Sequence, residues 1–249
     1  MSGALLAGFW GLVGGAALLL GAAIAYVVAI PPRMVAGIMA VGSGVLISAL
    51  SFELMEEAAE TGGLAATGAG FVAGAAVYTA ANVYISRRGG HDRKRSGDQQ
   101  RDADEGGGLA LAVGALLDGV PESMVIGLSL LSGQGVSLVA VAAVFLSNVP
   151  EGLSSVAGMR RAGRSAGYIF GVWGGIALAS GAAAMVGYVA FDGASPAWVA
   201  AVNAVAAGAI LAMIADTMAP EAFEQAREYA GLITVLGFLT AFTLSKMAG

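Results

Sequence analysis

Two short patterns place carboxylates inside otherwise apolar stretches of the sequence. Residues 118–122 are Asp-Gly-Val-Pro-Glu, and residues 147–151 are Ser-Asn-Val-Pro-Glu. In an α-helix, side chains four positions apart lie on one face, so the first and last residues of each pattern point the same way. Oxygen atoms of this kind are the ligands that hard divalent cations prefer. The candidate metal ligands are therefore Asp118, Glu122, Ser147, Asn148 and Glu151.

The prolines and the apolar surroundings favour the same interpretation. Pro121 and Pro150 lack an N–H, which frees the carbonyls of Leu117 and Leu146 as oxygen ligands or hinge points. A charge at the centre of a bilayer costs about 2.5–3.5 kcal/mol, so the acids need a partner, and a bound cation is the simplest one. The alternative is a polar network that only ties two helices together. For the serine and asparagine of the second pattern, hydrogen bonding between helices is an equally good explanation.

The composition predicts an integral membrane protein. Of the 249 residues, 57% are hydrophobic and 12% are charged, against about 25% charged in an ordinary soluble domain. The 39 glycines suit close packing of helices in lipid. The chain has no cysteine and a single histidine, His91, which excludes disulfides, thiolate sites and multi-histidine metal sites. Any metal site must therefore be rich in oxygen.

The apolar runs predict an all-α polytopic membrane protein of eight transmembrane helices that form one domain, 1–249. Each run is close to the length of about 20 residues that crosses about 30 Å of hydrocarbon. The predicted spans are about 4–28, 34–55, 64–86, 109–131, 136–159, 166–190, 198–219 and 229–246. Residues 87–108 form the one long polar stretch, which we expect to be a flexible cytoplasmic loop containing a solvated His91. The short turn at 132–135 makes the fourth and fifth helices antiparallel neighbours.

The distribution of basic residues predicts the orientation. With both termini outside, the inner loops contain 11 of the 12 Lys and Arg residues, and only Lys246 lies at an outer end. This asymmetry satisfies the positive-inside rule, so we expect a multi-pass protein of the cell membrane. Acids then mark both mouths of a path through the bundle, although solvated acids are also common at span ends. The acids are Glu53, Glu56 and Glu57 outside, and Asp216 and Glu221 inside.

The two Pro-Glu patterns in successive spans resemble the motifs of the ZIP family of divalent metal transporters. That family has eight spans, outside termini and a variable inner loop between spans three and four. Its metal site combines a His-Asn-x-Pro-(Asp or Glu)-Gly motif in span four with a His-x-x-Pro-Glu-Gly motif in span five. By this resemblance, Glu122 and Glu151 stand on the family's acids, while Asp118 and Ser147 stand where the family has histidines. Asn148 occupies a variable position that is a ligand in some members.

The resemblance implies transmembrane transport of divalent metal ions (zinc, manganese or iron) through a carboxylate-lined site between the fourth and fifth helices. The missing histidines favour metals that prefer oxygen. The alternative is a proton- or sodium-coupled cation exchanger or solute carrier in which the same acids relay protons. We expect no enzymatic activity, because no span contains a histidine to act as a base, and no cofactor besides the transported metal. The expected partners are divalent metal ions and the lipid bilayer, with no nucleic acid, and a homodimer is compatible with the sequence.

Overall fold

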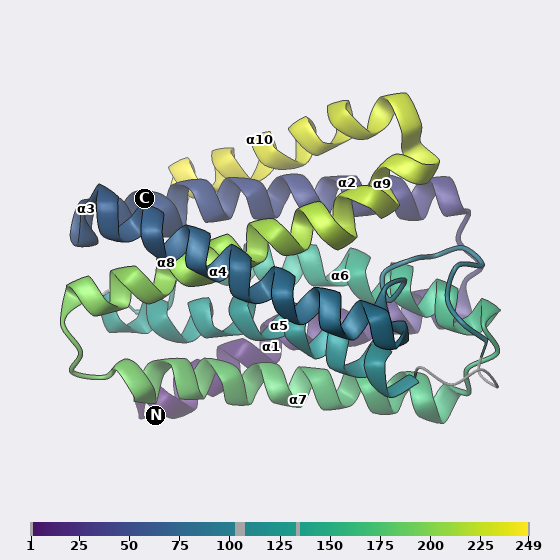
Figure 1. The fold of residues 1–249 in the computed structure, drawn as a ribbon, viewed down its shortest axis with the longest axis horizontal. Coiled ribbons are helices and arrows are strands. Elements are labelled where there is room, and N and C mark those ends of the chain that lie inside the picture. Colours follow the sequence, from purple (N-terminus) through teal and green to yellow (C-terminus); the bar gives the residue numbers. More distant parts are fainter. Residues whose placement is uncertain (1, 103–107, 133–134, 249) are drawn as a thin grey trace.

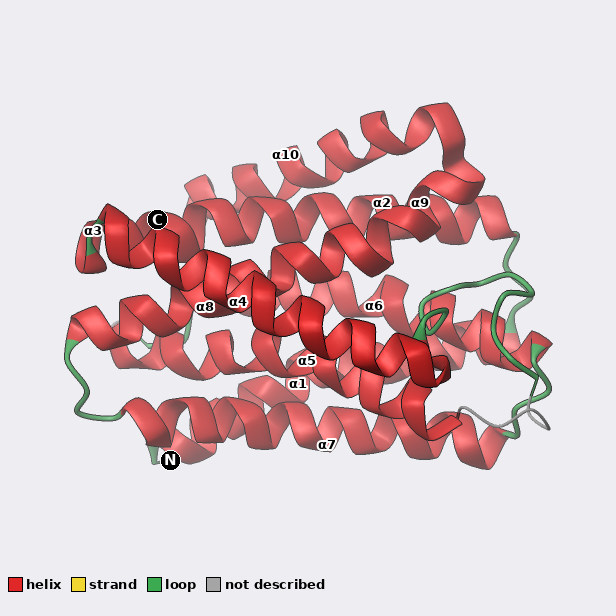
Figure 2. Cartoon of the chain, in the orientation of Figure 1, coloured by secondary structure: helices red, strands yellow, loops and turns green. Residues whose placement is uncertain are grey.

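The protein is all-α. The computed structural model describes residues 2–102, 108–132 and 135–248, and within these ranges every regular element is a helix (Figure 2). In chain order the α-helices are α1 (Gly3–Val27), α2 (Pro32–Ala49), α3 (Glu56–Gly62), α4 (Leu64–Ile85), α5 (Gly108–Ser129), α6 (Leu138–Arg161), α7 (Ala166–Phe191), α8 (Pro196–Met213), α9 (Ala219–Ala226) and α10 (Ala230–Ala248). Shorter elements are the π-helical stretches Leu50–Met55, Ser86–Gly90 and Ile214–Met218 and the 3-10 turns Leu130–Ser132 and Arg227–Tyr229.

The helix starts follow from the local sequence. Pro32 and Pro196 stand in the first turns of α2 and α8, where a missing N–H breaks no intrahelical hydrogen bond. Ser137 and Ser165 cap α6 and α7, because each side chain accepts a hydrogen bond from the N–H three residues further on. These starts lie close to the predicted span boundaries.

Within the described ranges, seven helical stretches are long and apolar enough to cross a membrane, one fewer than the eight spans expected. The difference lies in Pro196–Met247, a stretch of 52 residues that includes both the seventh and the eighth predicted segments. A straight helix of that length would measure about 78 Å, far more than about 30 Å of hydrocarbon. The chain instead turns at Arg227, whose φ is 47°, and α10 packs along α2 while α8 packs on α4. The long apolar helices support a polytopic membrane protein.

Glycines allow pairs of helices to pack backbone against backbone. A Cβ on Gly152 of α6 would collide with the backbone of α1, and a Cβ on Gly21 of α1 would collide with the backbone of α6. The same reciprocal contact joins α2 to α10 and α4 to α8. Helices in lipid gain their packing energy from such close approaches, because the surrounding hydrocarbon is as apolar as their own side chains. The α1 contact fixes the position of α6, which carries the second of the two patterns.

The two ends of the bundle differ in what they contain. Figure 1 shows both termini and α3 at one end, and the chain that connects α4 to α5 at the other. The connections from α1 to α2 and from α6 to α7 lie at that second end too. The expected topology requires this arrangement, with the termini and the polar loop on opposite sides. Which end faces the cytoplasm stays a prediction.

Candidate functional site

Helices α5 and α6 bring all five predicted ligands into the interior. Asp118, Glu122, Ser147, Asn148 and Glu151 are each between 0 and 4% exposed. Both helices continue through their internal prolines, so each pattern keeps its helical spacing. Buried carboxylates are stable only when other groups balance their charge.

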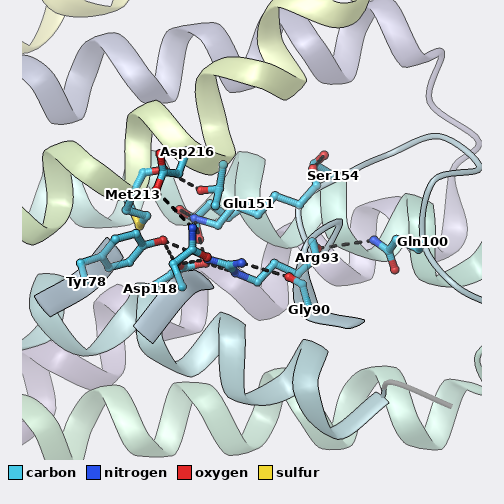
Figure 3. A network of polar contacts seen from close by, with 12 residues as sticks. Tyr78, Gly90, Arg93, Gln100, Asp118, Glu151, Ser154, Met213 and Asp216 are labelled. Atoms are coloured by element: carbon cyan, nitrogen blue, oxygen red, sulfur yellow. Dashed lines mark hydrogen bonds and ion pairs between the residues drawn. The ribbon is translucent and has the colours of Figure 1, made fainter. Parts of the chain in front are cut away.

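Asp118 is held by an ion pair with a residue of the α4–α5 connection. Arg93 Nε lies 2.8 Å from Asp118 Oδ2, and Arg93 Nη2 lies 2.9 Å from Oδ1, which is the bidentate geometry of a strong pair. Tyr78 of α4 donates its hydroxyl to Asp118 Oδ1 at 2.6 Å and accepts from Arg93 Nη2 at 2.9 Å. Figure 3 shows these side chains converging on one point. Burial by itself lowers the pKa of Arg93, but the Asp118 carboxylate more than offsets this, so the net shift of the pKa is upward.

Lys94 bridges the two patterns. Its Nζ lies 2.5 Å from Glu151 Oε1 and 3.3 Å from Asp118 Oδ2. The lysine is 4% exposed, so this ammonium is almost completely withdrawn from solvent. A carboxylate of α5 and a carboxylate of α6 therefore share one position for a cation.

The origin of these two cations differs from the expectation. The predicted spans contain no basic residue that could balance the acids, and the sequence predicts a flexible loop at residues 87–108 without placing any of its residues in the interior. Arg93 and Lys94 of this loop nevertheless enter the bundle, where both are buried and pair with the acids. The physical reason is that an unpaired charge in the interior costs more than the ordering of a few loop residues. The excess of acids in the spans is a signal that cations are needed, but it does not single out these two residues.

Further hydrogen bonds hold the loop against the bundle. Ser96 donates its backbone N–H to Glu221 Oε1 of α9 at 3.1 Å, and its hydroxyl donates to the same oxygen. Ser154 of α6 donates its hydroxyl to the Lys94 carbonyl at 2.5 Å. Gln100 donates its side-chain amide to a carbonyl of α6 at 3.1 Å. Glu221, which the sequence places at the inner mouth, thus binds the loop.

Glu122 differs from the other two acids of the site. It is 1% exposed, and neither carboxylate oxygen has a hydrogen-bond partner. Its side chain borders a small apolar cavity together with Leu46, Val125 and Val144. Buried polar groups without a partner are rare in folded proteins, and each needs an explanation. Of the three carboxylates, Glu122 alone has both oxygens available to a ligand.

The other two candidate ligands make ordinary helix contacts. Ser147 donates its hydroxyl to the Val144 carbonyl of its own helix at 3.0 Å. Asn148 donates its amide to the Gly14 carbonyl of α1 at 2.9 Å. Asn148 thus makes the hydrogen bond between helices that the alternative explanation expects, whereas Ser147 makes one within its own helix. Among the residues that the structure describes, no three acidic or histidine side chains gather as a metal-holding group.

The acids expected at the outer mouth are spread over two places. Glu53 lies in a π-helical stretch and accepts a hydrogen bond from the Ser245 hydroxyl of α10 at 2.5 Å. Glu57 lines a cavity of about 540 Å³ together with Asp192 and Asn203, among others. Glu56 is exposed.

Asp216 occupies a second π-helical stretch, between α8 and α9. It is exposed, and it accepts a hydrogen bond from Asn82 of α4 at 3.2 Å. Asp216 and Glu151 are both among the residues of the polar network that Figure 3 draws. Glu53 and Asp216 thus both lie where an α-helix is locally widened, a deformation that is frequent at functional sites.

Comparison with known proteins adds no relative. No protein-family model matches the sequence, and no curated protein matches it. The ZIP resemblance is therefore carried by the two patterns and by the number and order of the predicted spans.

Proposed function

We propose that this protein is a divergent ZIP-type transporter that carries divalent metal ions (zinc, manganese or iron) across the cell membrane. One observation carries the proposal. The Lys94 ammonium lies 2.5 Å from Glu151 and 3.3 Å from Asp118, so carboxylates of two neighbouring helices share one cation position. Secondary transporters commonly bind their substrates between helices near the middle of the membrane.

The chemistry of the site suits a divalent cation. Glu122 lies one helical turn from Asp118 on the same face of α5, and both of its oxygens are without partners. Together with Glu151 it adds carboxylate oxygens to a set that contains no nitrogen or sulfur ligand. Such a set favours manganese or iron(II), while zinc also accepts carboxylates.

Thermal unfolding of the purified protein in detergent tests the binding step. A ligand that binds only the folded state at about 100 times its Kd adds about 2.7 kcal/mol of stability. We expect manganese or zinc to raise the melting temperature of the wild type. The Glu151→Gln variant should lose this protection, and Glu228→Gln, which changes an exposed acid, should keep it. A melting temperature that no divalent metal raises would contradict the proposal.

The exchanger alternative is favoured by one observation, namely that the ammonium now in the site is monovalent. An exchanger with proton-relaying acids would respond to sodium or to a pH gradient. The same unfolding measurement separates the two functions, because an exchanger would be protected by sodium or left unprotected, and divalent metals would have no specific effect.

A further inference from the structure

We infer that Lys94 competes with the transported cation for the position between Asp118 and Glu151, so that residues 93–100 form a tethered plug that the cation must displace. We call residues 93–100 the loop plug. The inference rests on the proposed cation transport and names a residue that sets the apparent affinity of the same site.

The competition follows from the atoms that both cations need. The Lys94 ammonium occupies Glu151 Oε1 and Asp118 Oδ2, which are oxygens that a metal ion would bind. A metal ion and an ammonium repel each other, so both cannot sit there together. Lysine is a point charge on a flexible stem, which makes its contact easier to exchange than the bidentate contact of Arg93.

The loop plug can leave without unpacking any transmembrane helix. It lies between α4 and α5, outside both helices, and the chain that leads into it turns at Gly89, whose φ is 101°. Arg95 and Gln99 reach Glu224 at 2.6 Å each, but these contacts are exposed and contribute little stability. The buried anchors are Arg93, Lys94, Ser96 and Gln100, all of them on the loop plug itself.

A permanent structural network would be built differently. Apolar residues of similar size usually stabilise an interior as well as a buried ion pair does. Here the cations come from a connection instead of from the spans, and they leave Glu122 without a partner. An occupant that exchanges with a metal ion must come from outside the membrane helices and must leave some ligands free, and the loop cations meet both conditions.

The consequence for transport is quantitative. A site that is competent only in the fraction of molecules without the plug shows an apparent affinity lowered by that fraction. Removing the Lys94 charge should therefore tighten binding of the substrate cation without adding any ligand.

Single-cysteine reporters measure the displacement directly, because the natural chain has no cysteine. Ser96→Cys reports from the loop plug, and Ser154→Cys reports from α6, where Ser154 contacts the Lys94 carbonyl. Both positions are buried, whereas the control position His91→Cys is exposed. With purified protein in detergent, saturating manganese should accelerate maleimide labelling of both reporters at least about fivefold and leave the control unchanged.

Uptake kinetics provide a second measurement that does not depend on the reporters. Lys94→Met should lower the KM for manganese at least about threefold, because the plugged fraction falls. Lys94→Arg keeps the charge and should not lower it. Lys246→Met is the matched control at the far end of the molecule and should behave as wild type.

The outcomes separate this inference from the proposed function. If manganese is transported but changes neither the labelling of the reporters nor the KM of Lys94→Met, the network is static and the inference is wrong. If manganese releases the reporters but is not transported, the competition at the site holds and the transport proposal fails. If the Ser96→Cys reporter is labelled rapidly without metal, that substitution has itself loosened the loop plug. In that case the inference holds only if manganese accelerates labelling of Ser154→Cys and Lys94→Met lowers the KM, and it is wrong if neither occurs.

Discussion

At the scale of single residues, Glu122 is the acid whose chemistry is least satisfied. Its two oxygens are buried without hydrogen-bond partners beside an apolar cavity. The neutral Glu122→Gln variant should have an unchanged or higher melting temperature, because a neutral amide is easier to bury than a charge. Manganese uptake should nevertheless fall at least about tenfold, since a charged ligand is gone. Uptake that equals wild type and the exposed-acid control Glu228→Gln would remove Glu122 from the site.

The Arg93–Asp118 pair permits a prediction about stability. Arg93→Met leaves a buried carboxylate without its bidentate partner, which costs about 3 kcal/mol or more. The double variant Arg93→Met with Asp118→Asn should recover a large part of that loss. Denaturant titration in detergent measures both. The control is Arg161→Met, whose pair with Asp98 at 3.4 Å is exposed and should contribute less than about 1 kcal/mol.

Equal effects of Arg93→Met and Arg161→Met would show that the buried pair does not hold the loop. A double variant that is no more stable than Arg93→Met alone would mean that the cost lies in lost packing instead of in the uncovered charge.

The sequence predicts where the acids are but not what they contact. Spacing within a helix is local, so the burial of Asp118, Glu122 and Glu151 could be anticipated from the sequence. The contacts of Arg93 and Lys94 depend on how a connection folds back, which has no periodic signal. The charge balance of the spans was the one available indication, and it indicates only that cations are needed.

At the scale of the helices, the contact between α1 and α6 holds the second pattern in place. Gly152→Ala would drive a methyl group into the α1 backbone at Leu18 and should lower the yield of folded protein and its melting temperature. Gly174→Ala is the control, because a Cβ there has no neighbour within 4 Å and alanine favours helix by about 1 kcal/mol. Size-exclusion profiles and melting curves of the two variants measure the difference. Equal stability would show that α1 and α6 can separate without harm.

The sequence predicts the positions of the helices far better than it predicts the π-helical stretches within them. Apolar length, proline starts and serine caps predict the helices closely. The π-helical stretches that contain Glu53 and Asp216 have no comparable sequence signal, because an extra residue in a helical turn is stabilised by tertiary contacts.

At the scale of the whole molecule, the basic residues predict sidedness. In intact cells, an impermeant maleimide should label Lys246→Cys, which is exposed near the C-terminus. His91→Cys should be labelled only after permeabilisation, because it lies at the opposite end of the bundle. Labelling of His91→Cys in intact cells would invert the orientation and place the loop plug outside.

The predicted number of spans differs from the number of continuous helical stretches at one place, near the C-terminus. The sequence predicts eight spans, whereas the described part of the chain has seven continuous helical stretches that are long and apolar enough, because Pro196–Met247 runs through a sharp turn with little loss of helix. Local hydropathy finds both arms of that stretch. At Arg227 the chain turns so that α10 packs against α2, an arrangement that only the three-dimensional structure shows.

Manganese uptake into proteoliposomes that contain the purified protein tests the central claim most directly, namely that carboxylates of α5 and α6 share a transported cation. Wild type and Glu228→Gln should accumulate manganese above empty liposomes, and Glu151→Gln should lose most of this uptake at equal reconstitution. Uptake by Glu151→Gln that equals the wild type, or no uptake by the wild type of manganese, zinc or iron(II), would contradict the claim.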